Sequence, residues 1–169
     1  YAYFCKAVME TMIKLGFYPD IIHANDWQAA LSVVYLNTKY RYVEGFEKTK
    51  TVYTIHNIEY QGKYDFSILG DVFDLGPESY ALMRYDDCIN LTKAAIECAD
   101  RVSTVSPRYA EEIQSAEYSH ALHHVLYRNA HKLCGILNGI DYDYYNPAKD
   151  EPLAKHYDRR NIISGKRAN

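Results

Sequence analysis

Apolar residues at the start of the chain recur every three or four positions, which predicts an amphipathic helix. Phe4, Val8 and Met12 follow this spacing, which matches the turn of an α-helix. Gly16 can adopt the left-handed conformation that often ends a helix, so we expect the helix to end there. Because a helix is already under way next to Tyr1, which is not an initiator methionine, we expect the chain to begin partway through a larger protein.

Further along, short apolar runs alternate with amphipathic stretches. The predicted strands are 21–24, 51–55, 102–105 and 133–137, and the predicted helices are about 27–40, 90–98 and a further one from 107. Strand–helix–strand units imply parallel strands joined by right-handed crossovers. We therefore expect an α/β fold, with a Rossmann-like parallel sheet and helices on both faces.

Local signals refine this outline. Asp26 is a strong candidate to cap the helix that follows it, and Ser106 with Pro107 forms the favoured pair at a helix start. Residues 57–89 are irregular and contain several glycines, and connections of this length are usually functional. We expect one domain over residues 1–150 and a polar connector over 151–169.

Composition excludes several classes of protein. The chain has 48% hydrophobic residues and a formal net charge of −3, which gives no electrostatic reason for binding nucleic acid or an anionic membrane. No apolar run is long enough to span a bilayer, and no signal peptide is visible. The four cysteines form no CxxC pair, so we expect reduced thiols and a cytoplasmic protein.

Residue types and motifs narrow the chemistry further. The 18 tyrosines suit the apolar faces and hydroxyls of sugars, although most tyrosines simply fill core edges and surfaces. Histidines at 120, 123, 124 and 131 lack a cysteine or carboxylate partner at a fixed spacing, so we predict no metal site. The sequence contains no glycine-rich dinucleotide or phosphate loop and no GxSxG serine motif.

Polar groups follow each of the four predicted strands. They are His23–Asp26, His56–Asn57, Ser106–Pro107 and Asn138–Asp141. Because ligands of open parallel sheets bind beyond the carboxyl ends of the strands, we expect these groups to gather at one edge as a candidate site. Each also has a structural alternative: a helix cap for Asp26, a hydrogen-bonded structural histidine for His56, and a backbone-driven turn for Asn138–Gly139.

Five segments, in order, resemble bacterial glycogen synthases and plant starch synthases. They are HANDWQAA at 23–30, TIHNIEYQG at 54–62, KAAI with ADRV at 93–102, TVSPRYAEEI at 104–113, and GILNGID at 135–141 followed by Asn146–Pro147. Each match is modest, but the ordered set is specific and covers nearly the whole chain. Two positions depart from the pattern: Gln28 stands where many members have histidine, and Ala95 where glycine is common.

The resemblance implies a GT-B glycosyltransferase, which has two Rossmann-like domains and a cleft between them. This chain would be the later part of the N-terminal, acceptor-side domain, and activity would need a C-terminal nucleotide-sugar domain that these residues do not include. The implied reaction transfers glucose from ADP-glucose to the non-reducing 4-OH end of an α-1,4-glucan with retention, and it needs no cofactor or metal. This chain alone would be inactive.

The resemblance also assigns roles to individual residues. His56 would hydrogen-bond the transferred glucose near its 6-hydroxyl, and Asp26 would line the cleft beside the reacting centre; these are the expected catalytic residues. The expected substrate-binding residues are Asn57, Tyr60, Gln61, Asn138 and Gly139. Among them, Asn138 would contact the same sugar from the other side, while Tyr60 and Gln61 would shape the acceptor side.

Two other functions stay open on sequence grounds. A related sucrose- or trehalose-type transferase would share the fold, although the Tyr60–Gly62 segment argues against it. A glucan-binding module without catalysis is the second alternative, since the residues here would make only half of a cleft.

Overall fold

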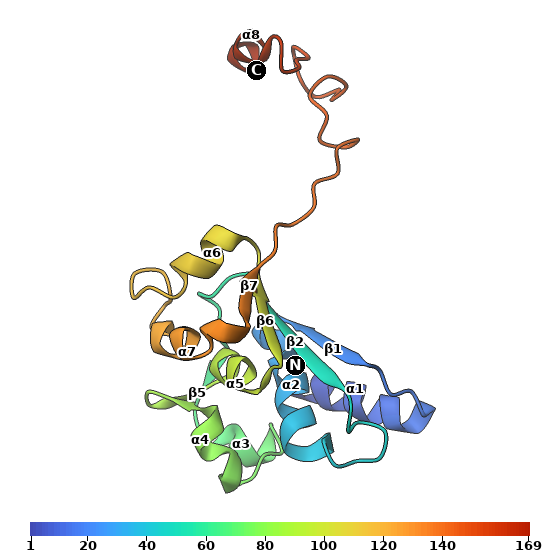
Figure 1. The fold of residues 1–169 in the computed structure, drawn as a ribbon, viewed down its shortest axis with the longest axis vertical. Coiled ribbons are helices and arrows are strands. Elements are labelled where there is room, and N and C mark those ends of the chain that lie inside the picture. The colour runs from blue at the N-terminus through green and yellow to red at the C-terminus, as the bar shows by residue number, and fades with distance from the viewer. The chain divides into compact units, whose positions relative to one another are not determined.

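The computed structural model describes residues 1–169, which form two compact units, Tyr1–Leu137 and Asn138–Asn169. The first unit is built on a four-stranded parallel sheet in the order β1-β2-β6-β7 (Figure 1). Its strands are β1 (Ile21–Asn25), β2 (Lys50–Ile55), β6 (Arg101–Thr104) and β7 (Leu133–Gly135). The prediction of an α/β fold with a parallel sheet is confirmed.

Helices precede or connect these strands much as the sequence predicts. They are α1 (Ala2–Leu15), α2 (Asp26–Tyr35), α3 (Ile68–Asp71), α4 (Tyr80–Met83), α5 (Leu91–Cys98), α6 (Pro107–Glu112), α7 (His123–Arg128) and α8 (Ile162–Ala168). Single 3₁₀ turns occur at Pro77–Ser79 and Ala130–Lys132. Helix α1 ends at Gly16, which has the expected left-handed conformation with φ 60°.

The helix after β1 is less regular than its sequence pattern. The sequence predicts one helix over about 27–40, but α2 changes after Tyr35 into a π-helix, Leu36–Tyr40. In this stretch the Asn37 amide donates to the carbonyl oxygens of Val33 and Cys98. Asn37 therefore ties the end of α2 to the end of α5, and apolar periodicity does not register a polar bond of this kind.

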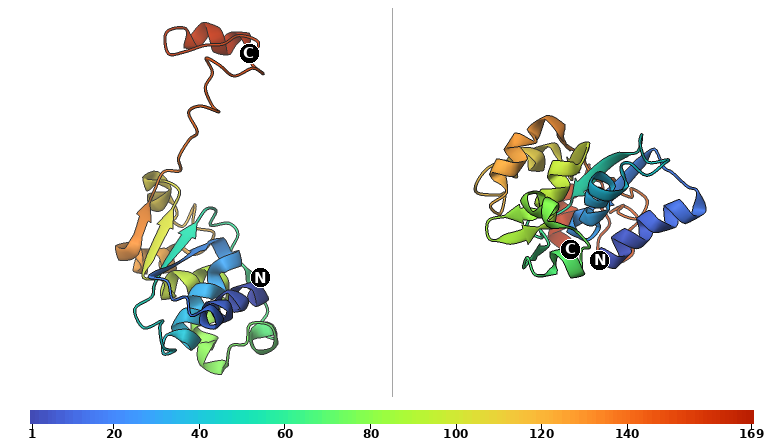
Figure 2. Two further views of the ribbon diagram at one scale, coloured as in Figure 1. Left: turned by 90° about the vertical axis from the view of Figure 1, so that its right-hand side faces the viewer. Right: turned by 90° about the horizontal axis from the view of Figure 1, so that it is seen from below.

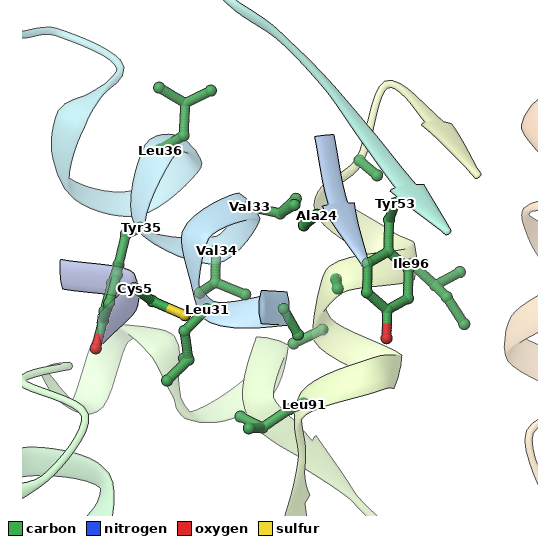
Figure 3. Packing of buried hydrophobic residues seen from close by; sticks show 14 of the residues in the cluster. Cys5, Ala24, Leu31, Val33, Val34, Tyr35, Leu36, Tyr53, Leu91 and Ile96 are labelled. Carbon is green, nitrogen blue, oxygen red and sulfur yellow. The ribbon is translucent and has the colours of Figure 1, made fainter. Parts of the chain in front are cut away.

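The core lies between the sheet and the pair α2 and α5, which pack against each other. Ala24, Tyr53 and Val102 are neighbours in the strand register and are buried on this side. Leu31 and Ile96 reach the same cluster from the two helices (Figure 3). The Tyr53 hydroxyl is 3.0 Å from the Thr92 hydroxyl, and burial raises the pKa of Tyr53, with the charge of Asp26 acting in the same direction.

The other face of the sheet is more open. Along β1 the residues alternate, so that Ile21, His23 and Asn25 are exposed. Thr54 links two strands on this face, since its hydroxyl lies 2.6 Å from His23 Nε2 and 2.7 Å from Ser103 Oγ. The strand order runs in one direction (Figure 2), so right-handed crossovers place their helices on one side. The crossover helices α2 and α5 therefore lie on the side opposite this more open face.

The excursion between β2 and α5 contains a small antiparallel sheet that the sequence did not predict. Its strands β3 (Lys63–Tyr64), β4 (Arg84–Tyr85) and β5 (Cys88–Asn90) lie in the order β3-β5-β4. Strands of two or three residues are too short for a period of two to be recognised. Strand β5 leads directly into α5, which joins the excursion to the core.

The second unit consists mainly of turns and ends in α8. Inside it, the Tyr157 N–H donates to the Pro147 carbonyl, and Gly165 lies directly against the Tyr157 side chain. The division between the units falls after Leu137, and the connector predicted over 151–169 lies within the second unit. Strand β7 ends at Gly135, and no later strand extends the sheet.

A cavity in the centre of the α2–α5 contact should lower the stability of the fold strongly. Leu31→Ala should lower the free energy of unfolding by about 2 to 5 kcal/mol, because Leu31 is 1% exposed and its neighbours are packed on all sides. Urea unfolding followed by circular dichroism measures this loss. Tyr42→Ala is the control, since Tyr42 is 92% exposed, and an equal loss in both variants would contradict the described core.

Candidate functional site at the carboxyl ends of β1 and β2

Asp26 stands at the end of β1 in an unusual backbone conformation. Its φ is 56°, in the left-handed region that residues with a side chain seldom adopt. The prediction that Asp26 caps α2 is wrong: Asn25 occupies the cap position, and neither side chain makes a capping hydrogen bond. Left-handed backbone at a non-glycine residue is strained and is found preferentially at functional sites.

The Asp26 carboxylate binds the next strand instead. Asp26 Oδ1 accepts a hydrogen bond of 2.8 Å from the backbone N–H of His56, the first residue after β2. In addition, the His56 ring nitrogen Nε2 lies 3.0 Å from Asn25 Oδ1. The pairing of Asn25 with Thr54 in the parallel register brings these groups together. The expectation that the polar groups after β1 and β2 meet at one edge is confirmed.

The contact with Asn25 fixes the orientation of the His56 ring. A side-chain carbonyl oxygen only accepts hydrogen bonds, so with the amide in this orientation Nε2 carries the proton. Nδ1 then has a lone pair, and it makes no hydrogen bond to the protein. The exposed His56 ring therefore offers one acceptor to a ligand hydroxyl. Asn25 belongs to the predicted polar group His23–Asp26, but the sequence assigns it no role of its own.

A tight turn, Asn57–Tyr60, follows His56. Asn57 Oδ1 accepts from the Glu59 N–H at 2.9 Å, and the Asn57 carbonyl accepts from the Tyr60 N–H at 3.3 Å. The amide nitrogen of Asn57 has no protein partner and is exposed. Tyr60 is 61% exposed at the tip of the turn. The turn thus presents an amide and an aromatic ring to solvent.

An open pocket of about 320 Å³ adjoins this turn. Its lining residues are Trp27, Glu59, Tyr60, Gln61, Gly62, Lys63 and Tyr64. Trp27 and Tyr64 have ring centroids 6.3 Å apart, so the pocket combines aromatic surfaces with one acidic and one basic side chain. We call it the aromatic pocket. Larger hollows of about 440 and 510 Å³ are lined mainly by residues of α1 and by residues near α3.

The sequence predicts that Gln61 binds substrate, but its side chain points into the protein. It is 3% exposed. Its amide nitrogen donates to the carbonyl oxygens of Ile58 and His120, and its carbonyl oxygen accepts from the Asn90 amide. The carboxamide therefore has its partners within the protein, and the expectation that Gln61 shapes the acceptor side stays a prediction.

Asn138 and Gly139 open the second unit, where both are exposed. Their expected place beside His56 stays a prediction. Ser106, the polar residue after β6, caps α6 as predicted and accepts from the Tyr109 N–H at 2.9 Å. Gly135 is needed here, because a side chain on it would meet the Ser106 carbonyl oxygen at 2.0 Å.

The remaining titratable groups form no metal site. No group of three His, Cys, Asp or Glu side chains could hold a metal ion. His123 and His124 have ring centroids 3.9 Å apart, and His123 Nδ1 lies 3.4 Å from Ser119 Oγ. Burial raises the pKa of the Cys98 thiol to about 11, so this thiol is protonated and unreactive at neutral pH.

None of the helices is both long and apolar enough to cross a bilayer.

With this geometry in place, comparison with known proteins identifies the family. Residues 1–128 match the starch synthase catalytic domain family, so the chain belongs to it and the resemblance seen in the motifs is confirmed. The glycogen synthase of Streptococcus equi subsp. equi is 45% identical over 170 residues, which are 99% of this chain and 36% of that protein. The glycogen synthase of Clostridioides difficile is 45% identical over 161 residues, 94% of this chain and 33% of that protein.

The fold agrees with a solved structure of the same family. The catalytic domain of starch synthase IV from Arabidopsis thaliana, solved bound to ADP and acarbose, matches with a TM-score of 0.77 and 37% sequence identity. The match covers 93% of this chain and 33% of that one. The chain therefore spans about a third of the length of the relatives that it matches.

The left-handed backbone at Asp26 can be tested with substitutions that separate conformational strain from helix propensity. Asp26→Gly should be more stable than Asp26→Ala by about 1 kcal/mol, because both lose the bond to His56 but only alanine carries the left-handed strain. Chemical denaturation of the two variants measures the difference.

The same pair of substitutions at Thr11, an exposed position within α1, is the control. There alanine should be more stable than glycine by about 1 kcal/mol, as in any helix interior. If alanine is also the more stable residue at position 26, the described backbone at Asp26 is wrong.

Proposed function

We propose that this chain forms the acceptor side of a glycogen (starch) synthase that transfers glucose from ADP-glucose, with retention, to the non-reducing 4-OH end of an α-1,4-glucan. The observation that supports this most strongly is the arrangement of Asn25, Asp26 and His56 at the carboxyl edge of the sheet in a member of this family. The edge is where open parallel sheets bind their ligands.

In this proposal His56 binds the transferred glucose. Asn25 holds the ring by Nε2 and Asp26 holds the backbone, so Nδ1 is free to accept from the 6-hydroxyl. A ring fixed before the sugar arrives loses little conformational freedom on binding. Because charge develops on the sugar during transfer, a fixed dipole and the nearby Asp26 carboxylate stabilise the transition state more than the ground state.

The glucan acceptor occupies the aromatic pocket. Sugar rings have apolar C–H faces and polar hydroxyl edges, and the exposed ring of Tyr60 offers the former a flat surface. Glu59 and Lys63 provide an acceptor and a donor for hydroxyls. Asn57 uses its free amide nitrogen on the acceptor. For Asn138 and Gly139, the family motif alone supports binding of the transferred glucose.

The donor side lies outside these residues. In the proposal a C-terminal nucleotide-sugar domain binds ADP-glucose, and the chain described here is inactive without it. The reaction requires no cofactor or metal, since donor groups of the second domain stabilise the leaving diphosphate. We place the enzyme in the cytoplasm, where four unpaired cysteines persist.

His56→Ala tests the proposal in the full-length protein. It should lower kcat with ADP-glucose and a maltooligosaccharide by roughly 100-fold, the scale of losing one group that stabilises the transition state. Incorporation of labelled glucose into glucan measures the rate. His131→Ala is the control, because His131 is an exposed histidine next to the amino end of β7 and should leave kcat unchanged.

An unchanged rate in His56→Ala would remove this residue from the site. Faster transfer from UDP-glucose, or transfer to fructose or glucose phosphate, would point to the sucrose- or trehalose-type alternative. Glucan binding without any transfer would identify a binding module.

A further inference from the structure

A buried amide pair, Gln61 and Asn90, joins three separate segments of the first unit. Gln61 Nε2 donates to the Ile58 carbonyl at 3.1 Å and to the His120 carbonyl at 2.9 Å. Gln61 Oε1 accepts from Asn90 Nδ2 at 2.7 Å. Asn90 is fully buried, and its Oδ1 accepts from the Lys93 N–H at 3.0 Å, which makes it the N-cap of α5.

The backbone around this pair completes the same connection. The first N–H groups of α5, which have no partner within the helix, donate to the turn: Leu91 to the Gly62 carbonyl and Thr92 to the Gln61 carbonyl, each at 3.1 Å. Gly62 has a φ of 64°, and a side chain on it would come within 2.8 Å of the Trp27 ring. The end of the turn is therefore anchored on the N-terminus of α5.

The third segment is a turn with two consecutive left-handed residues. His120 has a φ of 46° and Ala121 a φ of 75°, a combination that costs energy for residues with side chains. Gln61 binds the carbonyl of His120, and the Tyr85 hydroxyl binds the carbonyl of Ala121. Two side-chain donors from the excursion thus hold this strained turn in place.

We infer that Gln61 and Asn90 are positioning residues, which hold the Asn57–Gly62 turn so that His56 and Tyr60 keep the geometry that binds sugar. They do this without touching substrate themselves. The inference rests on the proposed function for the identity of the ligand. The bonds on both sides of Tyr60 leave its ring free while the backbone beneath it is fixed, and small displacements of positioning groups can lower rates by up to about 100-fold.

Two variants break the pair in different ways. Gln61→Met keeps the length of the side chain and removes its three hydrogen bonds. Asn90→Ser keeps a good N-cap for α5 but is too short to reach Gln61. Gln114→Met is the matched control, because Gln114 makes a single bond to the Ala110 carbonyl outside the site.

In the full-length protein both variants should lower kcat by roughly 10- to 100-fold, with a change in KM for maltooligosaccharide of less than about threefold. The double variant should be no slower than the slower single one, because both act through one connection. Amide hydrogen exchange at Leu91 and Thr92 should accelerate at least tenfold, while Val102 in the central sheet keeps its protection. Gln114→Met should change none of these.

Three results would overturn the inference. A rise in KM alone, with unchanged exchange at Leu91 and Thr92, would mean that Gln61 contacts the acceptor. Multiplying effects in the double variant would mean that the two residues act separately. Unchanged exchange in both single variants would mean that the pair holds nothing in place.

The exchange measurement needs no activity, so it decides on the amide pair even if the protein transfers no glucose and the proposed function fails. If Gln61→Met does not fold, Asn90→Ser decides alone.

Discussion

Parallel pairing of β1 with β2 is the constraint on which the candidate site depends. The register places Asn25 beside Thr54, and both strands end at the same edge of the sheet. Asp26 can then reach the backbone of His56, and Asn25 can reach its ring. In an antiparallel pair the two strand ends would lie at opposite edges, and these contacts could not form.

The energy for holding Asp26 in a strained conformation comes from the packing that follows it. Helix α2 carries an almost continuously buried stretch, Ala30–Tyr35, and packs on both α5 and the sheet. The position of the helix is set by this apolar contact, which is worth far more than the strain at one residue. A second support comes after His56 in the chain, where the N-terminus of α5 bonds the carbonyl groups of Gln61 and Gly62. The two supports share α5, so the core and the site are connected through one helix.

Features that depend on apolar periodicity and on simple capping rules can be predicted from the sequence. The four strands, the end of α1 at Gly16 and the cap at Ser106 all follow from such patterns. The π-helix after α2 and the small antiparallel sheet could not be predicted this way, because they depend on single hydrogen bonds and on strands of two or three residues. Asp26 shows the limit most clearly: its residue type favours a helix cap, but the carboxylate binds a residue that is distant in sequence and adjacent in the sheet.

The candidate site can likewise be predicted only where it follows from the regular pattern of strands and helices. Strand order brings together Asp26 and His56, and the alternation of strands and helices was enough to predict it. The inward direction of Gln61 was not predictable, because its partners Asn90 and His120 come from segments without a regular pattern. Asn138 belongs to the second unit, and its role rests on the family motif.

The proposed function requires His56 to bind the transferred hexose while Asp26 lies beside it. The decisive measurement is a crystal structure of the full-length protein with ADP and a maltooligosaccharide inhibitor. We expect His56 Nδ1 to lie within hydrogen-bond distance, about 3 Å, of a hydroxyl on a sugar ring next to Asp26. A sugar bound elsewhere, with no contact to His56, would refute this role.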